Sequence, residues 1–175
     1  AVARAVAAGC EALDSWPAAD RAAAITLVCV PGPAEYAAAV EGLLARACAG
    51  VVNLSTVGFT AAAEAGARFA AAGVPALEAP VSGGPRAAAE GRLSLMASGS
   101  PELWRVAEPI LAHAAATRTW AGESHAPAQM LKLVNNLVAA TSLAITAEAV
   151  VLGEKAGIPL ETLVDVLNSA SGRTS

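Results

Sequence analysis

The chain has 175 residues, a formal net charge of −4 and two lysines, Lys132 and Lys155, among its basic residues. Hydrophobic residues make up 55% and charged residues 15%, so the chain can bury a sizeable core and is not a disordered protein. The acidic balance and an aromatic content of 3% argue against a nucleic-acid partner.

Short apolar segments alternate with helical patterns in the first part of the chain. Strands are predicted over residues 25–30, 51–56, 75–81, 93–97 and 117–121, and helices over residues 34–48, 60–72 and 101–114. Strands separated by helices of this length indicate βαβ units, so we expect an α/β fold with a Rossmann-like parallel sheet. Ligands of such sheets bind at the carboxyl ends of the strands.

After residue 122 the strand patterns stop. A long helix is predicted over residues 129–152 and a shorter one over residues 160–170, on either side of a Gly-Ile-Pro break. We therefore expect two domains, an α/β domain over residues 1–122 and the start of an all-helical domain over residues 123–175.

The most apolar segment, residues 131–152, is long enough to cross a bilayer. It contains Lys132, Asn135, Asn136 and Glu148, and charged groups are costly inside a spanning helix. A buried helix of a soluble protein with no membrane partner is the better interpretation.

The cysteines and the first residues bear on the compartment. Cys10, Cys29 and Cys48 are odd in number and lack the CxxC spacing of a metal or redox site. Residues 1–9 lack the apolar region of a secretory signal. Buried free thiols in the cytoplasm are expected.

Several motifs with known chemistry do not occur. The sequence contains no G-x-G triplet, and therefore no G-x-G-x-x-G dinucleotide fingerprint, and no Walker A pattern. His113 and His125 have no carboxylate at a metal-binding spacing, so no metal is expected and both are predicted as surface or loop histidines. Ser82 lacks the Gly-x-Ser-x-Gly context of a hydrolase nucleophile.

The segment Lys132-Leu-Val-Asn135-Asn136 places polar groups in an apolar helix. Lys132 and Asn136 are four residues apart and share a helix face. One interpretation is a polar hinge in which Lys132 extends outward to solvent. The other is a buried ammonium with a lowered pKa that exchanges a proton, beside an amide that holds a substrate oxygen. An arginine could not do this, because it stays charged.

Two strand ends carry further candidates. Ser82-Gly83-Gly84 offers a hydroxyl and backbone N–H groups that a ligand can approach closely, which suits a carboxylate or phosphate, although a plain tight turn has the same composition. The second is Asn53-Leu-Ser55-Thr56, where the hydroxyls would ordinarily cap the next helix.

Four segments together resemble the β-hydroxyacid dehydrogenases, which include 3-hydroxyisobutyrate dehydrogenase and tartronate semialdehyde reductase. Glu78-Ala-Pro-Val-Ser-Gly-Gly84, with Ala-Ala-Glu-Gly-Arg-Leu-Ser-Leu at residues 88–95, is similar to their substrate-binding signature. Lys132-Leu-Val-Asn-Asn136 is similar to their catalytic K-x-x-N-N segment, and residues 148–157 to the stretch after it. Leu54-Ser-Thr56 and Val30-Pro31 resemble two cofactor loops.

The resemblance implies reversible hydride transfer between NAD or NADP and a small carboxylate-bearing β-hydroxyacid or its semialdehyde. Lys132 would be the general acid/base, and Asn136 would orient the reacting oxygen. The implied substrate-binding residues are Ser82, Gly83, Gly84 and Asn135, and the implied cofactor-binding residues are Val30, Pro31 and Thr56. A homodimer or homotetramer is implied as well.

The sequence departs from the family pattern in three ways. Glu78 replaces the usual Asp, and Ser124-His-Ala-Pro-Ala-Gln129 replaces a glycine-rich G-x-G-Q. The first βαβ unit, with its fingerprint, is expected before Ala1, and the rest of the helical domain after Ser175. The alternatives are an imine reductase, a 6-phosphogluconate dehydrogenase relative, or a non-catalytic dinucleotide-binding module. Imine reductases generally have a residue other than lysine at the position of Lys132. Phosphogluconate enzymes usually have His at the position where this chain has Asn135.

Overall fold

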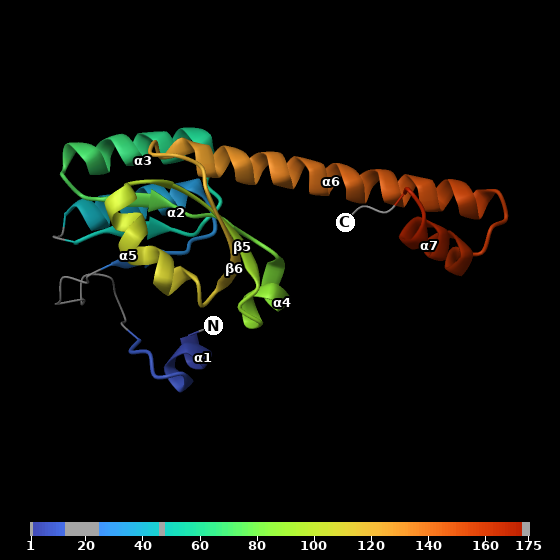
Figure 1. The fold of residues 1–175 in the computed structure, drawn as a ribbon, viewed down its shortest axis with the longest axis horizontal. Coiled ribbons are helices and arrows are strands. Elements are labelled where there is room, and N and C mark those ends of the chain that lie inside the picture. The colour runs from blue at the N-terminus through green and yellow to red at the C-terminus, as the bar shows by residue number, and fades with distance from the viewer. Residues whose placement is uncertain (1, 13–24, 46–47, 173–175) are drawn as a thin grey trace. The chain divides into compact units, whose positions relative to one another are not determined.

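The computed structural model describes residues 2–12, 25–45 and 48–172, which divide into two compact units, residues 1–132 and 133–175. The first unit alternates strands and helices, and α6 continues from it into the second (Figure 1). In chain order the elements are α1 (Val2–Ala7), β1 (Thr26–Val28), α2 (Pro33–Leu44), β2 (Val51–Asn53), α3 (Phe59–Ala71), β3 (Ala76–Glu78), β4 (Val81–Ser82), α4 (Gly84–Ala89), β5 (Leu93–Gly99), α5 (Pro101–Leu111), β6 (Ala115–Trp120), α6 (Ala126–Lys155) and α7 (Leu160–Ser169). The predicted elements are therefore present, although the strand predicted over residues 75–81 is divided into β3 and β4 by a break at residues 79–80. Residues 46–47 of the first predicted helix lie outside the described residues.

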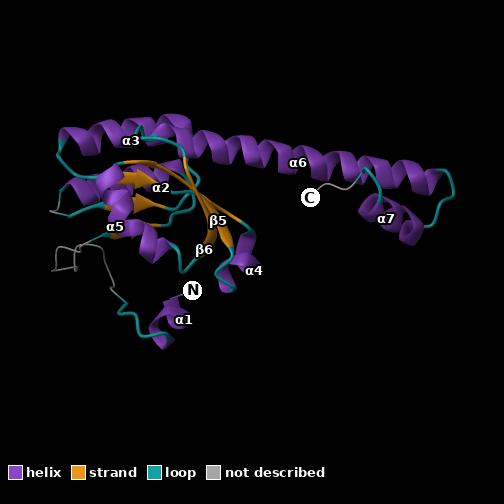
Figure 2. Cartoon of the chain, in the orientation of Figure 1, coloured by secondary structure: helices purple, strands orange, loops and turns teal. Residues whose placement is uncertain are grey.

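The strands form a six-stranded sheet in the order β1-β2-β3-β5-β4, with β6 paired to β5. Figure 2 draws the strands in orange. The pairs β1–β2, β2–β3 and β5–β6 are parallel, as predicted, whereas β5 runs antiparallel to both β3 and β4. The connections explain the difference. Helices α2 and α3 provide the long crossovers that parallel neighbours need, but only the six-residue α4 lies between β4 and β5. The fold is the predicted Rossmann-like one, with a mixed sheet.

The core of the first unit lies on both faces of this sheet. Successive side chains of a strand point to opposite faces. Accordingly, Val51 of β2 packs in a cluster with residues of α2 and α3, while its neighbour Val52 packs in a cluster with residues of α5. Both valines are fully buried, which explains why the strand is continuously apolar. Helices cover both faces and leave the carboxyl edge as the place for a site.

The second unit consists of residues 133–155 of α6 followed by α7. The positive φ of Gly157 (82°) allows the chain to turn after α6, and Leu163 of α7 packs against Gly153 of α6. Leu163 lies so close that a Cβ on Gly153 would come within 2.7 Å of its Cδ1.

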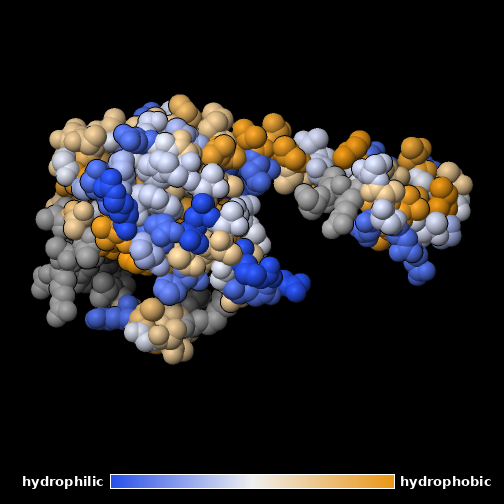
Figure 3. Space-filling view, viewed as in Figure 1, coloured by the Kyte–Doolittle hydropathy of each residue, from blue (hydrophilic) through white to orange (hydrophobic). Residues whose placement is uncertain are grey.

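The apolar part of α6 is exposed in the described chain, so the prediction of a buried helix is wrong here. Figure 3 shows apolar side chains along this part of the chain. The exposed apolar residues of α6 in this unit include Leu133, Val134, Leu137, Val138, Leu143, Ile145, Val151 and Leu152. Within the described residues, the ten-residue α7 is too short to cover the 30-residue α6. By length and hydropathy alone α6 could cross a membrane, which is weak evidence for a single helix.

The cysteines also differ from the prediction. All three are free, but Cys10 and Cys29 are exposed and Cys48 is half-buried. Cys29 directly follows β1, which pairs with β2 alone among the described strands. In the part of the chain that the structure describes, the expectation of buried thiols is therefore wrong.

Candidate active site at the carboxyl edge of the sheet

The ends of β1 and β2 are joined by a side-chain hydrogen bond. The Val30 N–H donates to Ser55 Oγ over 2.8 Å, and Ser55 is buried. Pro31 and Thr56, the next residues after these two positions, are exposed. The three predicted cofactor-binding residues, Val30, Pro31 and Thr56, thus lie at one edge of the sheet, where the side chain of Ser55 holds the two strand ends together.

The prediction that Ser55 or Thr56 caps the next helix is wrong. Helix α3 begins at Phe59, its cap residue is Gly58, and no side chain of the helix start caps it. Instead, Gln129 of α6 supplies the acceptor, because its Oε1 accepts hydrogen bonds from the N–H groups of Val57 (3.0 Å) and Gly58 (3.2 Å). A residue far along the chain therefore satisfies backbone donors before α3, and Ser55 is left to bind β1.

A buried carboxylate gathers the residues around this edge. Glu78, at the end of β3, is 2% exposed. Tyr36 Oη donates to its Oε1 over 2.8 Å, while Asn53 Nδ2 (2.8 Å) and Gln129 Nε2 (2.6 Å) donate to its Oε2. The cluster thus joins α2, β2, β3 and α6, and each of the three contacts is made by an uncharged donor. Gln129 Nε2 also donates to the Ser55 carbonyl over 2.9 Å.

The electrostatics of this cluster follow from its burial. Burial raises the pKa of Glu78 to about 7, and the three donated hydrogen bonds oppose that rise without cancelling it. Burial and the neighbouring Glu78 raise the pKa of Tyr36, so its hydroxyl keeps its proton and remains a donor. Glu78 is consequently a carboxyl group that changes charge near neutral pH inside the core.

Lys132 lies one turn after Gln129 on α6 and is 7% exposed. Burial lowers the pKa of its ammonium group from the usual lysine value, because the charged form is poorly solvated there. This agrees with the buried-ammonium interpretation rather than with a lysine that extends to solvent. Asn135 and Asn136 follow on α6 in the second unit, where both are exposed.

A second polar contact holds the start of α6. Ser98 of β5 is fully buried, its Oγ accepts a hydrogen bond from the Ala128 N–H (3.0 Å), and it donates to the His125 carbonyl (2.7 Å). Ser98 therefore caps α6 from β5, well before the helix in the chain. A capping rule that considers only residues next to the helix start does not identify it.

The ring of His125 is packed rather than placed on the surface. It lies against Gly66 of α3 and Gly99 of β5, and its Nδ1 is buried with no hydrogen-bond partner among the described residues. Burial lowers the pKa of His125, so the ring favours its neutral form. His125 lies in a loop as predicted, but as a packed ring, whereas His113 is exposed.

Replacing Gly66 with alanine is expected to destabilise the first unit by about 1–3 kcal/mol, the usual cost of overpacking. The new Cβ would come within 2.5 Å of His125 Cγ. The free energy of unfolding measured in urea checks this. The double variant Gly66→Ala/His125→Ala removes the obstructing ring but keeps the His125 Cβ, which would lie 2.8 Å from the new Cβ, so it should recover part of the loss. Equal destabilisation of the single and double variants would contradict the packing argument.

The third predicted group, Ser82-Gly83-Gly84, lies at the end of β4 and the start of α4. Gly83 and Gly84 have φ values of 126° and 69°, a left-handed conformation that favours glycine. A Cβ on Gly83 would also come within 2.7 Å of the Cβ of Ala87. The glycines thus have a backbone reason to be there, and their N–H groups lie at an exposed turn.

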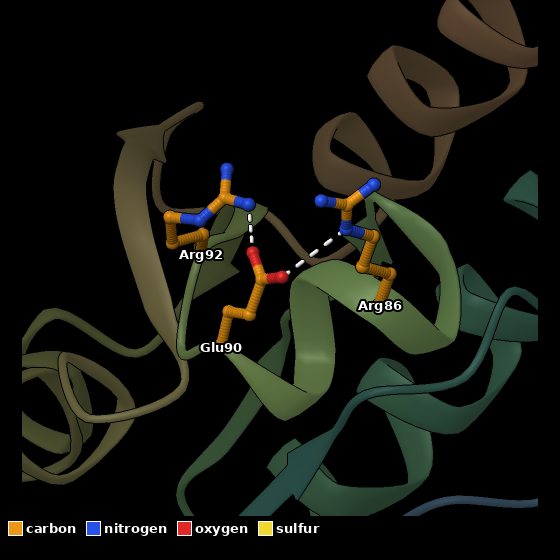
Figure 4. Close-up of polar contacts among 3 residues, drawn as sticks. All are labelled: Arg86, Glu90 and Arg92. Carbon is orange, nitrogen blue, oxygen red and sulfur yellow. Dashed lines mark hydrogen bonds and ion pairs between the residues drawn. The ribbon is translucent and has the colours of Figure 1, made fainter.

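Helix α4 after this turn carries a small surface ion-pair cluster. Glu90 pairs with Arg86 Nε over 3.2 Å and with the guanidinium of Arg92 (Figure 4). Both arginine side chains are mostly exposed, and exposed pairs contribute little to stability. The cluster joins the end of α4 to the chain entering β5 and adds no buried charge to the site.

Sequence reasoning missed the connections more than the residues. Glu78 and Gln129 were noted only as parts of two segments that depart from the family pattern, and Ser98 was not noted at all. The carboxylate of Glu78 at the end of the buried strand Ala76–Glu78 could have indicated this cluster. A buried carboxylate needs hydrogen-bond donors from neighbouring segments. Among the described residues, no group of three or more His, Cys, Asp or Glu could hold a metal ion.

Comparison with known proteins matches this architecture. Residues 1–122 match the family model of the NAD binding domain of 6-phosphogluconate dehydrogenase. Residues 126–175 match the model described as NAD-binding of NADP-dependent 3-hydroxyisobutyrate dehydrogenase. The two models together cover nearly the whole chain.

Individual relatives agree with the family models. An L-threonate dehydrogenase of Cupriavidus necator is 37% identical over 109 residues, 62% of this chain and 37% of the relative. A 3-hydroxyisobutyrate dehydrogenase of Pseudomonas aeruginosa is 35% identical over 134 residues, 75% of this chain and 45% of the relative. The matched segments thus span less than half the length of these two relatives.

Solved structures show the same fold. The Mycobacterium tuberculosis 3-hydroxyisobutyrate dehydrogenase with L-serine has a TM-score of 0.82 and 32% identity, over 93% of this chain and 56% of that one. A Streptomyces aurantiacus imine reductase has a TM-score of 0.81 at 22% identity, over 92% of this chain and 58% of that one, which shows a shared fold alone. On the family models and these relatives, the chain belongs to the β-hydroxyacid dehydrogenase family, with an NAD-binding domain of the 6-phosphogluconate dehydrogenase type.

Proposed function

We propose that the full-length protein is an NAD(P)-dependent oxidoreductase that interconverts a small β-hydroxyacid and its semialdehyde. One observation carries the proposal. Lys132 is a buried lysine of lowered pKa, and it lies one turn from Gln129, which is hydrogen-bonded to the carboxyl edge of the sheet. A buried ammonium at a ligand-binding edge suits a group that exchanges protons.

Lys132 supplies the proton chemistry in this proposal. When the hydroxyacid is oxidised, the neutral Lys132 Nζ takes the proton of the reacting hydroxyl as hydride leaves the carbon. In the reverse direction the ammonium returns that proton to the forming alkoxide. A lowered pKa increases the fraction of Nζ that can accept a proton near neutral pH. Asn136, four residues on, shares the helix face and would orient the same oxygen.

The substrate carboxylate is assigned to Ser82, Gly83 and Gly84, with Asn135 as a further polar contact. Two consecutive glycines in the left-handed region present their backbone N–H groups at an exposed turn, and such groups suit an anion. In this assignment the turn at residues 82–84 binds the carboxylate at one end of a short substrate, and Lys132 exchanges the proton at the other end.

The residues at the carboxyl edge fit the nicotinamide end of a dinucleotide. Pro31 and Thr56 are exposed just beyond two parallel strands, and the start of α2 has no side-chain cap over its first N–H groups. When bound, NAD or NADP supplies the hydride acceptor or donor. No residue is assigned to the pyrophosphate, since the sequence contains no G-x-G triplet.

The proposal includes a cytoplasmic homo-oligomer without membrane or nucleic-acid partners. The net charge of −4 does not favour a nucleic-acid surface. The exposed apolar residues of α6 are the surface that a homodimer or homotetramer would use, since such residues are usually covered in a soluble protein. Sedimentation equilibrium of the full-length protein counts the subunits.

The test is a two-step assay of the full-length protein. NADH and NADPH are first titrated against intrinsic fluorescence, and short β-hydroxyacids, including 3-hydroxyisobutyrate and L-threonate, are then assayed for cofactor reduction at 340 nm. Cofactor binding with turnover of at least one hydroxyacid is expected. Binding without any turnover would favour a non-catalytic dinucleotide-binding module, and no binding of either cofactor would reject both functions.

A further inference from the structure

Two buried polar side chains that hold the start of α6 lie opposite each other on neighbouring strands. Glu78 of β3 and Ser98 of β5 are register partners in the antiparallel β3–β5 pair. Both are almost or completely buried, at 2% and 0% exposure. Opposite positions of such a pair are about 5 Å apart. The two side chains therefore form one compact feature, which we call the α6 socket.

Each member of the socket holds a different group of the same helical turn. Ser98 Oγ accepts from the Ala128 N–H over 3.0 Å and so satisfies one of the donors at the helix start. Glu78 Oε2 accepts from Gln129 Nε2 over 2.6 Å and so fixes the adjacent side chain. Ser98 restrains the backbone of this turn, and Glu78 restrains its rotation through Gln129.

Gln129 itself has its amide fully used. Its Oε1 accepts from Val57 and Gly58, and its Nε2 donates to the Ser55 carbonyl and to Glu78. Four contacts leave the amide one orientation, because exchanging its oxygen and nitrogen would break all of them. The turn of α6 is thereby held against the chain segment that contains Thr56.

Lys132 is the next buried side chain along this face of the helix, three residues after Gln129. A helix transmits the position of one turn to the next, since the two are joined by backbone hydrogen bonds. Among the described residues, neither Glu78 nor Ser98 forms a hydrogen bond or ion pair with Lys132 itself. Any effect of the socket on the lysine must therefore pass through the turn that contains Ala128 and Gln129.

We infer that Glu78 and Ser98 are positioning residues for Lys132, acting as a two-point socket that sets where its Nζ lies at the carboxyl edge of the sheet. The inference rests on the proposed function, in which Lys132 exchanges the proton. Loosening the socket should lower kcat far more than it raises KM, because the substrate-binding turn at Ser82–Gly84 lies on other elements.

Two nearby serines provide a matched test in the full-length protein. Ser98→Ala removes the acceptor for α6, and Ser100→Ala removes the acceptor for α5, where Ser100 Oγ accepts from the Leu103 N–H over 3.2 Å. Both variants lose one hydroxyl and one helix-start hydrogen bond. Ser98→Ala also loses the hydrogen bond that buried Ser98 donates to the His125 carbonyl, so its decrease in Tm is expected to be somewhat larger. Ser98→Ala is expected to lose about ten- to a hundredfold in kcat, the scale of a misplaced catalytic group, and Ser100→Ala to keep kcat within twofold.

A second pair tests the other point of the socket. Glu78→Gln keeps an oxygen that accepts from Asn53 and Gln129, while its new amide donates to the Tyr36 hydroxyl, which can accept. Glu78→Leu has a similar size but offers no acceptor. The Leu variant is expected to lose kcat to the same extent as Ser98→Ala, whereas the Gln variant should retain most of it.

A readout independent of turnover separates this inference from the proposed function. The rate at which acetic anhydride acylates Lys132 is followed against pH by mass spectrometry of the lysine-containing peptide, and its midpoint reports the pKa of Nζ. The midpoint is expected to move toward the ordinary lysine value in Ser98→Ala and Glu78→Leu, and to stay in Ser100→Ala.

The outcomes divide as follows. An unchanged midpoint in both socket variants, or equal losses of kcat in Ser98→Ala and Ser100→Ala, would overturn the positioning role. If no hydroxyacid is turned over by the wild-type protein, the proposed function fails, and the midpoints alone still decide whether the socket controls Lys132.

Discussion

Replacing Lys132 with alanine is expected to lower kcat of the full-length enzyme by about two to four orders of magnitude, the usual contribution of a general acid/base. The alanine variant loses the only group to which the proposal assigns the reacting proton. Folding should survive, since Lys132 forms no hydrogen bond or ion pair with any residue that the structure describes and a buried unpaired lysine contributes little stability of its own. Steady-state kinetics with the best hydroxyacid from the screen, together with the Tm of the variant, measure both effects.

Two controls separate proton exchange from charge. Lys132→Arg keeps the positive charge but cannot release its proton near neutral pH, so it should be as inactive as the alanine variant. Lys155→Ala removes the other lysine of the chain, which is exposed at the end of α6, and should leave kcat unchanged. Near-normal turnover in Lys132→Ala would contradict the general acid/base role assigned to this residue.

Replacing Glu78 with glutamine is expected to change how the stability of the protein depends on pH. In the unfolded chain the carboxyl ionises near its usual pKa of 4.5, but in the folded protein burial raises the pKa to about 7. Between these values the folded state keeps a proton that the unfolded state has released, so stability falls as pH rises. The full loss, reached above about pH 7, is about 3 kcal/mol.

The measurement is urea unfolding of wild type and Glu78→Gln at pH 5 and pH 8. Glutamine does not titrate, and wild type has already lost part of this stability at pH 5, so the variant should gain about 2.5 kcal/mol relative to wild type between the two pH values. Glu64→Gln, which removes an exposed carboxylate on α3, should follow the wild-type profile. A constant difference between wild type and Glu78→Gln at both pH values would show that Glu78 does not titrate in the core.

Much of the fold was predictable because its patterns are local. The buried run around Val51 and Val52, bounded by turn residues, identified a strand that is indeed covered on both faces. The direction of β5 was less accessible, since strand direction depends on the length of the connection through α4 rather than on the strand's own residues. The exposure of α6 was not predicted for a similar reason. The hydrophobicity of a helix indicates that its apolar residues favour burial, but it does not show which segment covers them.

The candidate site divides in the same way. Lys132, Asn136 and the Ser82-Gly83-Gly84 turn carry their chemistry in residue type and spacing, so the sequence alone was enough to select them. A local rule would let Ser55 or Thr56 cap α3, but α3 has no side-chain cap, and Gln129 accepts instead from the N–H groups of Val57 and Gly58 just before it. Local rules fail where a partner comes from a distant segment with a better-placed acceptor.

By itself, the sequence determined the α/β pattern, the family, and the residue types available for proton exchange and carboxylate binding, because these follow from periodicity, composition and short motifs. Only the tertiary structure decided that Lys132 is buried, that Glu78 and Ser98 face each other across β3 and β5, and that both hold the same turn of α6. The physical reason is that burial and pKa depend on segments distant in the chain. The two lysines look equivalent as residue types, and what distinguishes them is the environment that the folded sheet provides.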